Sequence, residues 1–495
     1  MSKYIIAIDQ GTTSSRAVLF DSNAKMVAME QQEFKQYFPK SGWVEHDPEE
    51  IWSSQSKVLT DLIENNHINA TDIAAIGITN QRETTIVWDK NSGKAVYKAI
   101  VWQDKRTSAF CDKLKEEGYE SYVSDNTGLV LDSYFSGTKV NWILNNVDGA
   151  KENAANGDLK FGTVDSWLVW KLTNGKQHVT DCTNASRTLM YNIKSLEWDE
   201  KLLEMLDVPA SMLPEVRQSA DHFGDWEYKG VKIPIHGIAG DQQAALFGQT
   251  CLEPGMAKNT YGTGCFMLMN TGNEVCKSQN GLLSTIAYGI DGEIKYALEG
   301  SVFIAGAVVQ WLRDGLGIIG SAGETEAMAE SVADNDDVIM VPAFTGLGAP
   351  YWDQYSRGAI FGLTRDTKPA HLAKAAIESM AYQTKDILDA MQKDSGITLE
   401  ELKVDGGAVT NNYLMQFQAD LLGVGVVRPA FTESTALGAA LLAGYGVKLF
   451  DKTKLQSIQD VDKVYQPNWS EEKRKNRYAQ WQNAVKRTLN WLDKE

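Results

Sequence analysis

The segment of residues 5–20 constrains the fold of this chain more than any other, because two apolar runs enclose a short polar turn. The turn carries the carboxylate of Asp9, the glycine Gly11, four hydroxyl side chains and the guanidinium of Arg16. Glycine lets backbone N–H groups approach an anion closely, and hydroxyl and guanidinium groups donate hydrogen bonds to phosphate oxygens. An aspartate at the end of a buried strand can hold Mg²⁺. The pattern predicts a hairpin that binds phosphate and magnesium; the alternative is an ordinary hairpin with a Thr- and Ser-rich turn.

The chain has 495 residues, which is too long for one hydrophobic core, because cores stop growing at about 250–300 residues. We therefore expect two domains, residues 1–250 and 251–495, with Glu-Pro-Gly at 253–255 near the boundary. Acidic residues outnumber basic ones by 65 to 48, a net charge of −17. This balance argues against nucleic acid or an anionic membrane surface as the main partner.

The sequence also lacks signals for export or membrane insertion. Lys3 and a few apolar residues precede Asp9, and no later run reaches the ~18 apolar residues that a membrane span needs. The five cysteines form no Cys-x-x-Cys pair, and the six histidines never occur at the spacing of a metal site. These features predict a cytoplasmic protein with reduced thiols and no stable membrane insertion.

Two later segments combine an apolar strand with a polar turn. The predicted strand at 73–79 leads into a polar cluster at 80–84 that contains Arg82 and Glu83. Ligands collect at the carboxyl ends of strands in α/β sheets, so this pair is a candidate site; the alternative is a surface ion pair. Residues 259–269 again join a Gly-Thr turn to an apolar strand, a weak internal echo of the kind that a duplicated nucleotide-binding fold leaves.

Other nucleotide-binding motifs are absent or out of context. The P-loop pattern Gly-x-x-x-x-Gly-Lys-Ser/Thr does not occur. A Gly-x-Gly-x-x-Gly run occurs at 315–320, but it follows a helix-like segment instead of the strand that the dinucleotide-binding motif requires. The hypothesis of a nicotinamide dehydrogenase rests on this run alone. What remains is a set of glycine turns beside strands at Gly11, Gly262 and Gly407, an arrangement typical of actin-like ATPases.

Seven motifs in order resemble the FGGY family of carbohydrate kinases over nearly the whole chain. They occupy residues 9–16, 80–84, 134–142, 240–248, 261–264, 358–378 and 405–408. The resemblance implies an α/β fold of two actin-like ATPase (ribonuclease H-like) domains with a ligand cleft between them. Residues 1–250 would carry the polyol site and the phosphate hairpin, and residues 251–495 the adenine nucleotide side.

The resemblance also implies an activity: ATP-dependent phosphorylation of glycerol to sn-glycerol 3-phosphate and ADP, the first step of glycerol catabolism, in a homodimer or homotetramer. The pairs at 82–83 and 241–242 separate the members that act on glycerol from those that act on pentuloses and hexuloses. Asp241 would be the general base. Trp102 and Phe266 would cover the carbon backbone of glycerol, unless they are plain core residues. The implied substrate-binding residues are Arg82, Glu83, Trp102, Tyr134, Asp241, Gln242 and Phe266.

The cofactors implied are ATP and Mg²⁺. Asp9 would position the metal. The nucleotide would be bound from both sides of the cleft by Thr12, Thr13, Ser14, Arg16, Thr263, Gly306, Gln310, Gly407 and Asn411.

The chain departs from the family's regulatory motifs. Residues 224–230 have no histidine where some Gram-positive relatives are phosphorylated, and Lys232 stands where enteric relatives have the arginine of a fructose 1,6-bisphosphate site. Both controls are therefore in doubt. Two other activities stay open: a kinase for another polyol or sugar, and a non-catalytic actin-like ATP switch.

Overall fold

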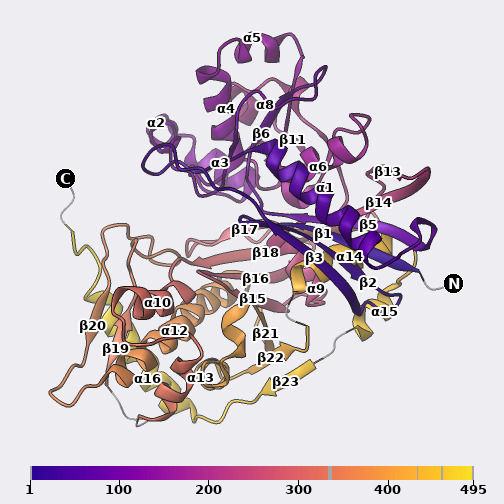
Figure 1. Ribbon diagram of the computed structural model, residues 1–495. Helices are drawn as coiled ribbons and strands as arrows, with labels where there is room; N and C mark the ends of the chain where they lie inside the picture. Colours follow the sequence, from indigo (N-terminus) through magenta and orange to yellow (C-terminus); the bar gives the residue numbers. More distant parts are fainter. Residues whose placement is uncertain (1–2, 333–336, 432, 459–460, 493–495) are drawn as a thin grey trace.

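The computed structural model describes residues 3–332, 337–431, 433–458 and 461–492, and it has two lobes, each built around a mixed β-sheet (Figure 1). The N-terminal sheet contains, from edge to edge, β13 (Gly224–Tyr228), β14 (Val231–Gly240), β5 (Ile73–Asn80), β1 (Tyr4–Gln10), β2 (Ser14–Phe20) and β3 (Met26–Glu33). The C-terminal sheet contains β17 (Leu283–Ile290), β18 (Glu293–Val302), β16 (Cys265–Gly272), β15 (Ala257–Tyr261), β21 (Glu401–Asp405), β22 (Gly425–Pro429) and β23 (Val461–Tyr465).

The two sheets share a five-stranded core. In the order β3-β2-β1-β5-β14, the first two pairings are antiparallel and the last two are parallel. The order β18-β16-β15-β21-β22 has the same directions. The weak internal repeat in the sequence therefore corresponds to a repeated sheet topology.

The opening hairpin forms as the sequence predicts. β1 and β2 pair so that Asp9 faces Arg16, and the backbone N–H of Gly11 closes the turn onto the Ser14 carbonyl at 3.0 Å. Every residue of β1 from Ile5 onward is buried, because β2 and β5 flank it and α1 (Pro48–Asn65) packs nearby. The site-bearing turn is thus fixed at the end of the central strand.

A helical region extends the N-terminal lobe at the top of Figure 1. Its helices are α2 (Ser108–Glu116), α3 (Glu120–Thr127), α4 (Ser136–Asn146), α5 (Ala150–Ala155), α6 (Val164–Leu172), α7 (Cys182–Ala185) and α8 (Glu200–Leu206). Short strands in this part of the chain pair with one another in two-stranded sheets: β4 (Glu45–His46) with β7 (Ala99–Ile100), β6 (Ile86–Asp89) with β8 (Leu159–Gly162), β9 (Val179–Asp181) with β12 (Glu215–Arg217), and β10 (Tyr191–Asn192) with β11 (Glu197–Trp198).

The lower lobe carries further helices. These are α10 (Gly306–Gln310), α11 (Glu324–Glu330), α12 (Pro369–Ser395), α13 (Asn412–Leu422) and α16 (Glu471–Lys486), with the strand pair β19 (Ile339–Val341) and β20 (Ala359–Phe361). α15 (Lys452–Ser457) lies instead beside β2, and its Leu455 belongs to the same core cluster as Ile5 and Val18 of the N-terminal sheet (Figure 1). Ser470 caps α16, and the buried Trp481 on this helix donates from Nε1 to Asp386 at 2.8 Å. The glycine run at 315–320 follows helical backbone, so it lacks the strand that a dinucleotide fingerprint requires.

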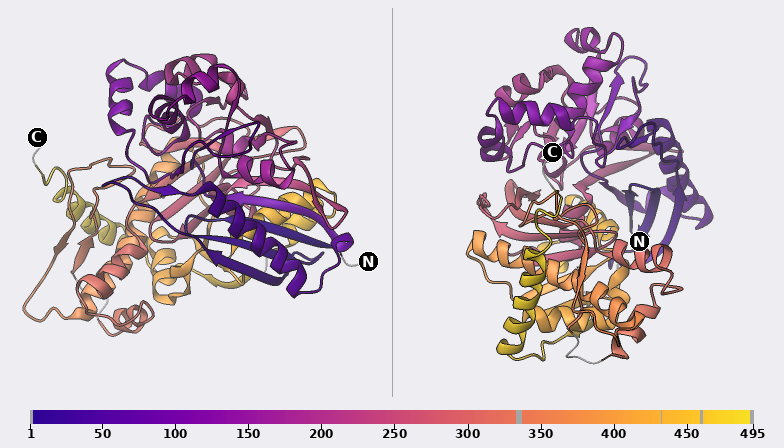
Figure 2. Two further views of the ribbon diagram at one scale, coloured as in Figure 1. Left: turned by 45° about the horizontal axis from the view of Figure 1, so that its top comes forward. Right: turned by 90° about the vertical axis from the view of Figure 1, so that its left-hand side faces the viewer.

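Two helices pack across the boundary near residue 250. α9 (Asp241–Gly248) follows β14, while α14 (Ser434–Gly446) comes from the C-terminal half yet packs on α9 and on β1, β5 and β14. Glycines permit this contact: a Cβ on Gly438 would lie 1.8 Å from the Ala244 carbonyl oxygen, and one on Gly77 2.0 Å from that of Ala439. Figure 2 shows the two lobes joined through this middle layer. Among the described residues, no helix combines the length and apolarity needed to cross a membrane.

Candidate active site

The predicted site residues Arg82, Glu83 and Asp241 come together at the ends of two neighbouring strands. Arg82 and Glu83 follow β5, and Asp241 begins α9 directly after β14. The strands are parallel and in register, with Gly240 opposite Asn80. The carboxyl ends of parallel strands meet at one edge of a sheet, which is why Asp241 shares a site with Arg82, 159 positions earlier in the sequence.

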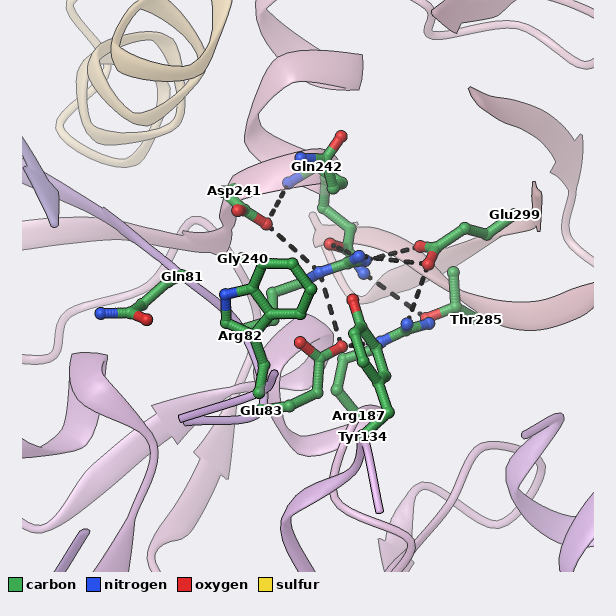
Figure 3. A network of polar contacts seen from close by, with 12 residues as sticks. Gln81, Arg82, Glu83, Tyr134, Arg187, Gly240, Asp241, Gln242, Thr285 and Glu299 are labelled. Carbon is green, nitrogen blue, oxygen red and sulfur yellow. Dashed lines mark hydrogen bonds and ion pairs between the residues drawn. The ribbon is translucent and has the colours of Figure 1, made fainter. Parts of the chain in front are cut away.

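A buried ionic network connects these residues (Figure 3). Arg82 Nε lies 3.2 Å from Asp241 Oδ1 and 3.6 Å from Glu83 Oε1. The Nη atoms of Arg82 donate to both carboxylate oxygens of Glu299, at 2.6 and 3.1 Å. Arg187 donates to Glu83 Oε1 at 2.7 Å and to Glu299 Oε1 at 2.9 Å. All four of these arginine and glutamate side chains are at most 2% exposed.

The electrostatics follow from burial and pairing. Burial raises the pKa of Glu83, although Arg82 and Arg187 oppose it. Burial would also raise the pKa of Glu299, but Arg187 and Arg82 outweigh it and lower that pKa to about 2. Glu299 is thus firmly ionised. Buried charges are costly unless paired, so this network is stable only as a complete set.

Asp241 differs from the other acids because one of its oxygens is open. Oδ1 accepts from the Gln242 backbone N–H at 2.8 Å and faces Arg82, whereas Oδ2 makes no hydrogen bond or ion pair to a described residue. The Asp241 side chain is 32% exposed. Burial raises the pKa of Asp241, while Arg82 lowers it and Asp9 raises it further. One oxygen is anchored and the other is available, which suits a carboxylate that accepts a proton.

Lys258, on β15, orients Gln242. Its Nζ donates to Gln242 Oε1 at 2.5 Å, to Thr260 Oγ1 at 2.8 Å and to the Phe266 carbonyl at 3.2 Å. An ammonium group has three donors and no acceptor, so the amide oxygen of Gln242 faces Lys258. The amide nitrogen, which donates to no described residue, is left as a donor. Burial lowers the pKa of Lys258 to about 8.

Aromatic side chains line the same region. The rings of Trp102 and Tyr134 meet edge to face at 5.6 Å, and Trp102 Nε1 donates to Thr12 Oγ1 at 3.0 Å. Trp102 and Phe266 are both half-buried, and Phe266 is tied to the site through its carbonyl and Lys258. Trp102 thus connects the phosphate hairpin with the ionic network.

The backbone at Glu83 is strained. Its φ of 61° is in the left-handed region, which is unfavourable for a residue with a side chain. The Glu83 carbonyl accepts from Ser136 Oγ at 3.0 Å and from Thr85 Oγ1 at 3.1 Å. These hydrogen bonds fix the turn that directs the carboxylate toward Arg187.

The phosphate hairpin presents a mixed set of groups. Arg16 forms ion pairs with Asp9 at 3.4 Å and with Glu433, which immediately precedes α14. Thr12 is half-buried and Thr13 exposed, whereas Ser14 is buried and its hydroxyl accepts from Gln31 Nε2 at 3.0 Å. The hairpin therefore offers Thr12, Thr13 and its backbone most openly.

A directional chain of hydrogen bonds supports the hairpin from behind. Gln81 Nε2 donates to the Gly11 carbonyl at 3.1 Å and lies 3.3 Å from His46 Nδ1. His46 Nε2 lies 2.6 Å from Gln36 Oε1, and Gln36 Nε2 donates to the Thr12 carbonyl at 2.8 Å. Burial lowers the pKa of His46 to about 3, so the ring is neutral and links the two amides.

The oxygen donors fit a magnesium ion bound together with a substrate. Asp9, 3% exposed at the end of β1, has its pKa raised by burial, and its charge in turn raises the pKa of Asp241. Two nearby carboxylates favour a divalent cation. In the part of the chain that is described, no group of three His, Cys, Asp or Glu side chains is placed to form a metal site alone.

A separate cavity of about 420 Å³ lies in the C-terminal lobe. Its wall combines bare glycine backbone with apolar side chains such as Met380 and Leu414. Asn411 caps α13 and donates to Thr325 Oγ1 at 3.2 Å. The structure brings together here all five nucleotide residues expected from this half: Thr263, Gly306, Gln310, Gly407 and Asn411.

Three residues of the polar network are absent from the sequence-based set: Arg187, Glu299 and Lys258. Each carries a charge within an otherwise apolar or small-residue stretch, such as Tyr-Ala-Leu-Glu-Gly-Ser-Val around Glu299. That pattern indicates a buried, paired charge, but it does not reveal the partner.

Comparisons with known proteins agree with this arrangement. Residues 4–248 match the N-terminal domain and residues 257–447 the C-terminal domain of the FGGY family of carbohydrate kinases. The chain is 62% identical over 495 residues to the glycerol kinase of Alkaliphilus metalliredigens, with 99% of each chain covered, and 60% identical over 494 residues to that of Fusobacterium nucleatum, again with 99% coverage of each.

Solved structures give the same result. The glycerol kinase of Plasmodium falciparum with ADP superposes with a TM-score of 0.94 at 36% identity, covering 98% of both chains. The gluconate kinase of Lactobacillus acidophilus shares the fold, with a TM-score of 0.86, 24% identity and 98% of both chains covered. With both domain matches, the repeated sheet and identity near 60% along its whole length, the chain belongs to the FGGY family of carbohydrate kinases.

Proposed function

We propose that this chain is a kinase that transfers the γ-phosphoryl group of ATP to a terminal hydroxyl of glycerol, giving sn-glycerol 3-phosphate and ADP. The observation that carries the proposal is the state of Asp241: Oδ1 is anchored by Arg82 and a backbone N–H, and Oδ2 is open within a polar, aromatic-lined site. The glycerol kinases that the chain resembles support the choice of acceptor.

The chemistry of the site suits an uncharged triol. Glycerol needs donors and acceptors in alternation, and each partner left unpaired when buried costs about 1–3 kcal/mol. Arg82 and the amide nitrogen of Gln242 supply donors, while Glu83 Oε2 and Asp241 Oδ2 accept no hydrogen bond from a described residue and supply acceptors. The faces of Trp102 and Tyr134 suit the C–H edge of the molecule.

Asp241 acts as the general base. Its raised pKa brings it toward the pH at which a base is most effective, while Arg82 keeps it ionised. As the terminal oxygen of glycerol attacks the γ-phosphorus, Oδ2 takes the hydroxyl proton and the bond to the ADP oxygen breaks. In such transfers positioning and charge stabilisation contribute most, and the base adds a further factor of about 10²–10⁴.

ATP is bound between the lobes. The adenosine portion occupies the cavity that Gly306 and Gly407 line, and the phosphates reach the hairpin at Thr12, Thr13 and Arg16. Ser14 contributes through its backbone, because its hydroxyl is engaged by Gln31. Asp9 would hold Mg²⁺, with Asp241 close by, and the ion would neutralise charge on the phosphoryl oxygens.

The two binding regions lie on opposite sides of the boundary near residue 250, so closure of the lobes accompanies binding and excludes water that would hydrolyse ATP. Small-angle scattering tests this step. The radius of gyration falls when ATP and glycerol are added together, and an unchanged radius contradicts closure.

A coupled ADP-release assay tests the activity. Glycerol, xylulose and gluconate are compared at equal concentration, with and without Mg²⁺. We expect Mg²⁺-dependent turnover that is fastest with glycerol. Faster turnover of xylulose or gluconate would assign the chain to another branch of the family, and ATP binding without turnover of any acceptor would indicate a non-catalytic ATP switch.

A further inference from the structure

Glu299 is the member of the buried ionic network that comes from the other half of the chain. It lies in β18 of the C-terminal sheet, whereas Arg82, Glu83, Arg187 and Asp241 all precede residue 250. Its side chain is 1% exposed. A carboxylate buried this far from water is stable only when cationic donors pair with it.

The geometry of Glu299 fixes the direction of Arg82. The two carboxylate oxygens accept from Nη1 at 2.6 Å and from Nη2 at 3.1 Å, a bidentate pair that holds the guanidinium plane. With both Nη atoms engaged, Nε is the edge that faces Asp241 and Glu83. Glu299 therefore determines how Arg82 meets the proposed base.

Glu299 also reaches Glu83 through a second arginine. Arg187 Nη2 donates to Glu299 Oε1 at 2.9 Å, and Arg187 Nε donates to Glu83 Oε1 at 2.7 Å. Arg187 Nη1 has no hydrogen-bond partner among the described residues, so the contacts of Nε and Nη2 with the two carboxylates pair the charge of this buried side chain. The chain Glu299–Arg187–Glu83 fixes one oxygen of Glu83 and leaves the other for substrate.

We infer that Glu299 is a positioning residue for the glycerol site: it holds Arg82 directly and Glu83 through Arg187, and so makes assembly of the site in one half depend on the other. The inference rests on the proposed function. Glu299 touches neither substrate nor nucleotide in this scheme, and it acts through the two arginines.

Charge balance gives Glu299 a second, measurable effect. The positive charges of Arg82 and Arg187 are matched by Glu83 and Glu299. Three charged groups act on Asp241: Arg82, which follows β5, Lys258 on β15 and Asp9 on β1. Removing the Glu299 charge leaves an excess positive charge beside Asp241, which stabilises its ionised form and moves its titration to lower pH.

The test compares Glu299→Gln with Glu293→Gln, the same substitution on the same strand at an exposed position. Within the described part of the chain, the Glu293 side chain pairs only with Lys295. For Glu299→Gln we expect kcat/KM for glycerol to fall by about 30-fold or more, since one partner of a buried charge pair is lost. Affinity for ADP, measured by calorimetry, should stay within about twofold because the nucleotide cavity is elsewhere. Glu293→Gln should match the wild type in both.

The pH profile separates positioning from mere loss of structure. The acidic limb of kcat/KM for glycerol should shift to lower pH in Glu299→Gln and return in Glu299→Asp, which restores the charge. An unmoved limb, a parallel loss of ADP affinity, or wild-type kcat/KM in Glu299→Gln would each overturn the inference. Absence of glycerol turnover in the wild-type protein would overturn the proposed function itself, and the inference with it.

Discussion

The two halves of this molecule share a five-stranded core but differ in what they place at the ends of the strands. In the N-terminal half the strand ends carry charged side chains: Asp9 at the end of β1, Arg82 after β5 and Asp241 after β14. In the C-terminal half Asp405 ends β21, but the cavity beside it is lined by glycine backbone at Gly306 and Gly407. We therefore expect one topology to support two kinds of recognition, by charged side chains at the polyol site and by backbone and shape at the nucleotide cavity.

This difference predicts how substitutions at the two sets of residues affect the protein. A substitution among the charged site residues changes the protonation and orientation of their neighbouring side chains but leaves the backbone in place. A substitution among the glycines changes shape first, because a Cβ on Gly306 would lie 2.6 Å from the Gly262 carbonyl oxygen. Changes among these charges should therefore appear in kcat and the KM for glycerol, and changes among the glycines of the cavity should appear in nucleotide affinity.

The largest effect is expected from Asp241→Asn. The variant keeps the size of the side chain but removes the base, so kcat should fall by a factor of about 10²–10⁴. ADP should bind as before, because the cavity is untouched. Steady-state kinetics and calorimetry measure the two quantities, with Asp225→Asn on the exposed β13 as the control. A variant with near-normal turnover would remove Asp241 from the mechanism.

Gly306→Ala should weaken nucleotide binding in the C-terminal half. The added methyl group meets backbone, and overpacking of about 1–3 kcal/mol would weaken ADP binding by about 5- to 150-fold. Gly425→Ala on β22 is the matched control, because its Cβ would meet nothing closer than 3.9 Å and Gly425 does not line the cavity. Calorimetry with ADP distinguishes them. Equal affinities in the two variants would show that close backbone approach does not shape the cavity.

Lys258→Met tests whether the C-terminal half also orients the polyol site. Without the ammonium group, the amide of Gln242 is free to turn, and the lost hydrogen bond should raise the KM for glycerol by about three- to tenfold. Lys403→Met is the control: Lys403 is opposite Lys258 on β21 and equally buried, but it donates to Gln249 and Thr250. A shift of KM in the control alone would contradict this role.

The smallest effect concerns alkaline pH. Burial lowers the pKa of Lys258 to about 8, so raising the pH through that value removes a proton and one donor from the contact with Gln242. The KM for glycerol should rise above about pH 8 by no more than in Lys258→Met. In the Lys258→Met variant this rise should vanish. Its persistence there would assign the alkaline limb to another group.

Much of the site is predictable because its chemistry is local. The hairpin can be recognised within residues 9–16, and its register, with Asp9 opposite Arg16, is set by the short turn at Gly11. The repeated sheet leaves only a short polar turn before an apolar strand in each half, at Gly11 and Gly262. That signal indicates the duplication but not the seven-stranded order.

The rest of the site could not be predicted, because it depends on tertiary contacts. Glu299, Arg187 and Lys258 have no motif of their own, and their roles depend on partners 16 to 217 positions away. The same limit applies to α14: its sequence places it in the second half, whereas its packing places it on the first sheet. A boundary drawn by sequence position alone therefore separates elements that share a core.

The glycine contacts between α9 and α14 have a mechanical consequence. Helices that interlock through side-chain ridges resist sliding, because the ridges must pass one another. Here Gly438 approaches the Ala244 backbone and Gly248 that of Ser434, so the surface between the helices is smooth. α9 begins at Asp241, and Glu433 before α14 pairs with Arg16. In the lobe closure that we propose, this contact would let α9, which begins at the proposed base, shift along α14, which follows the ion-pair partner of Arg16.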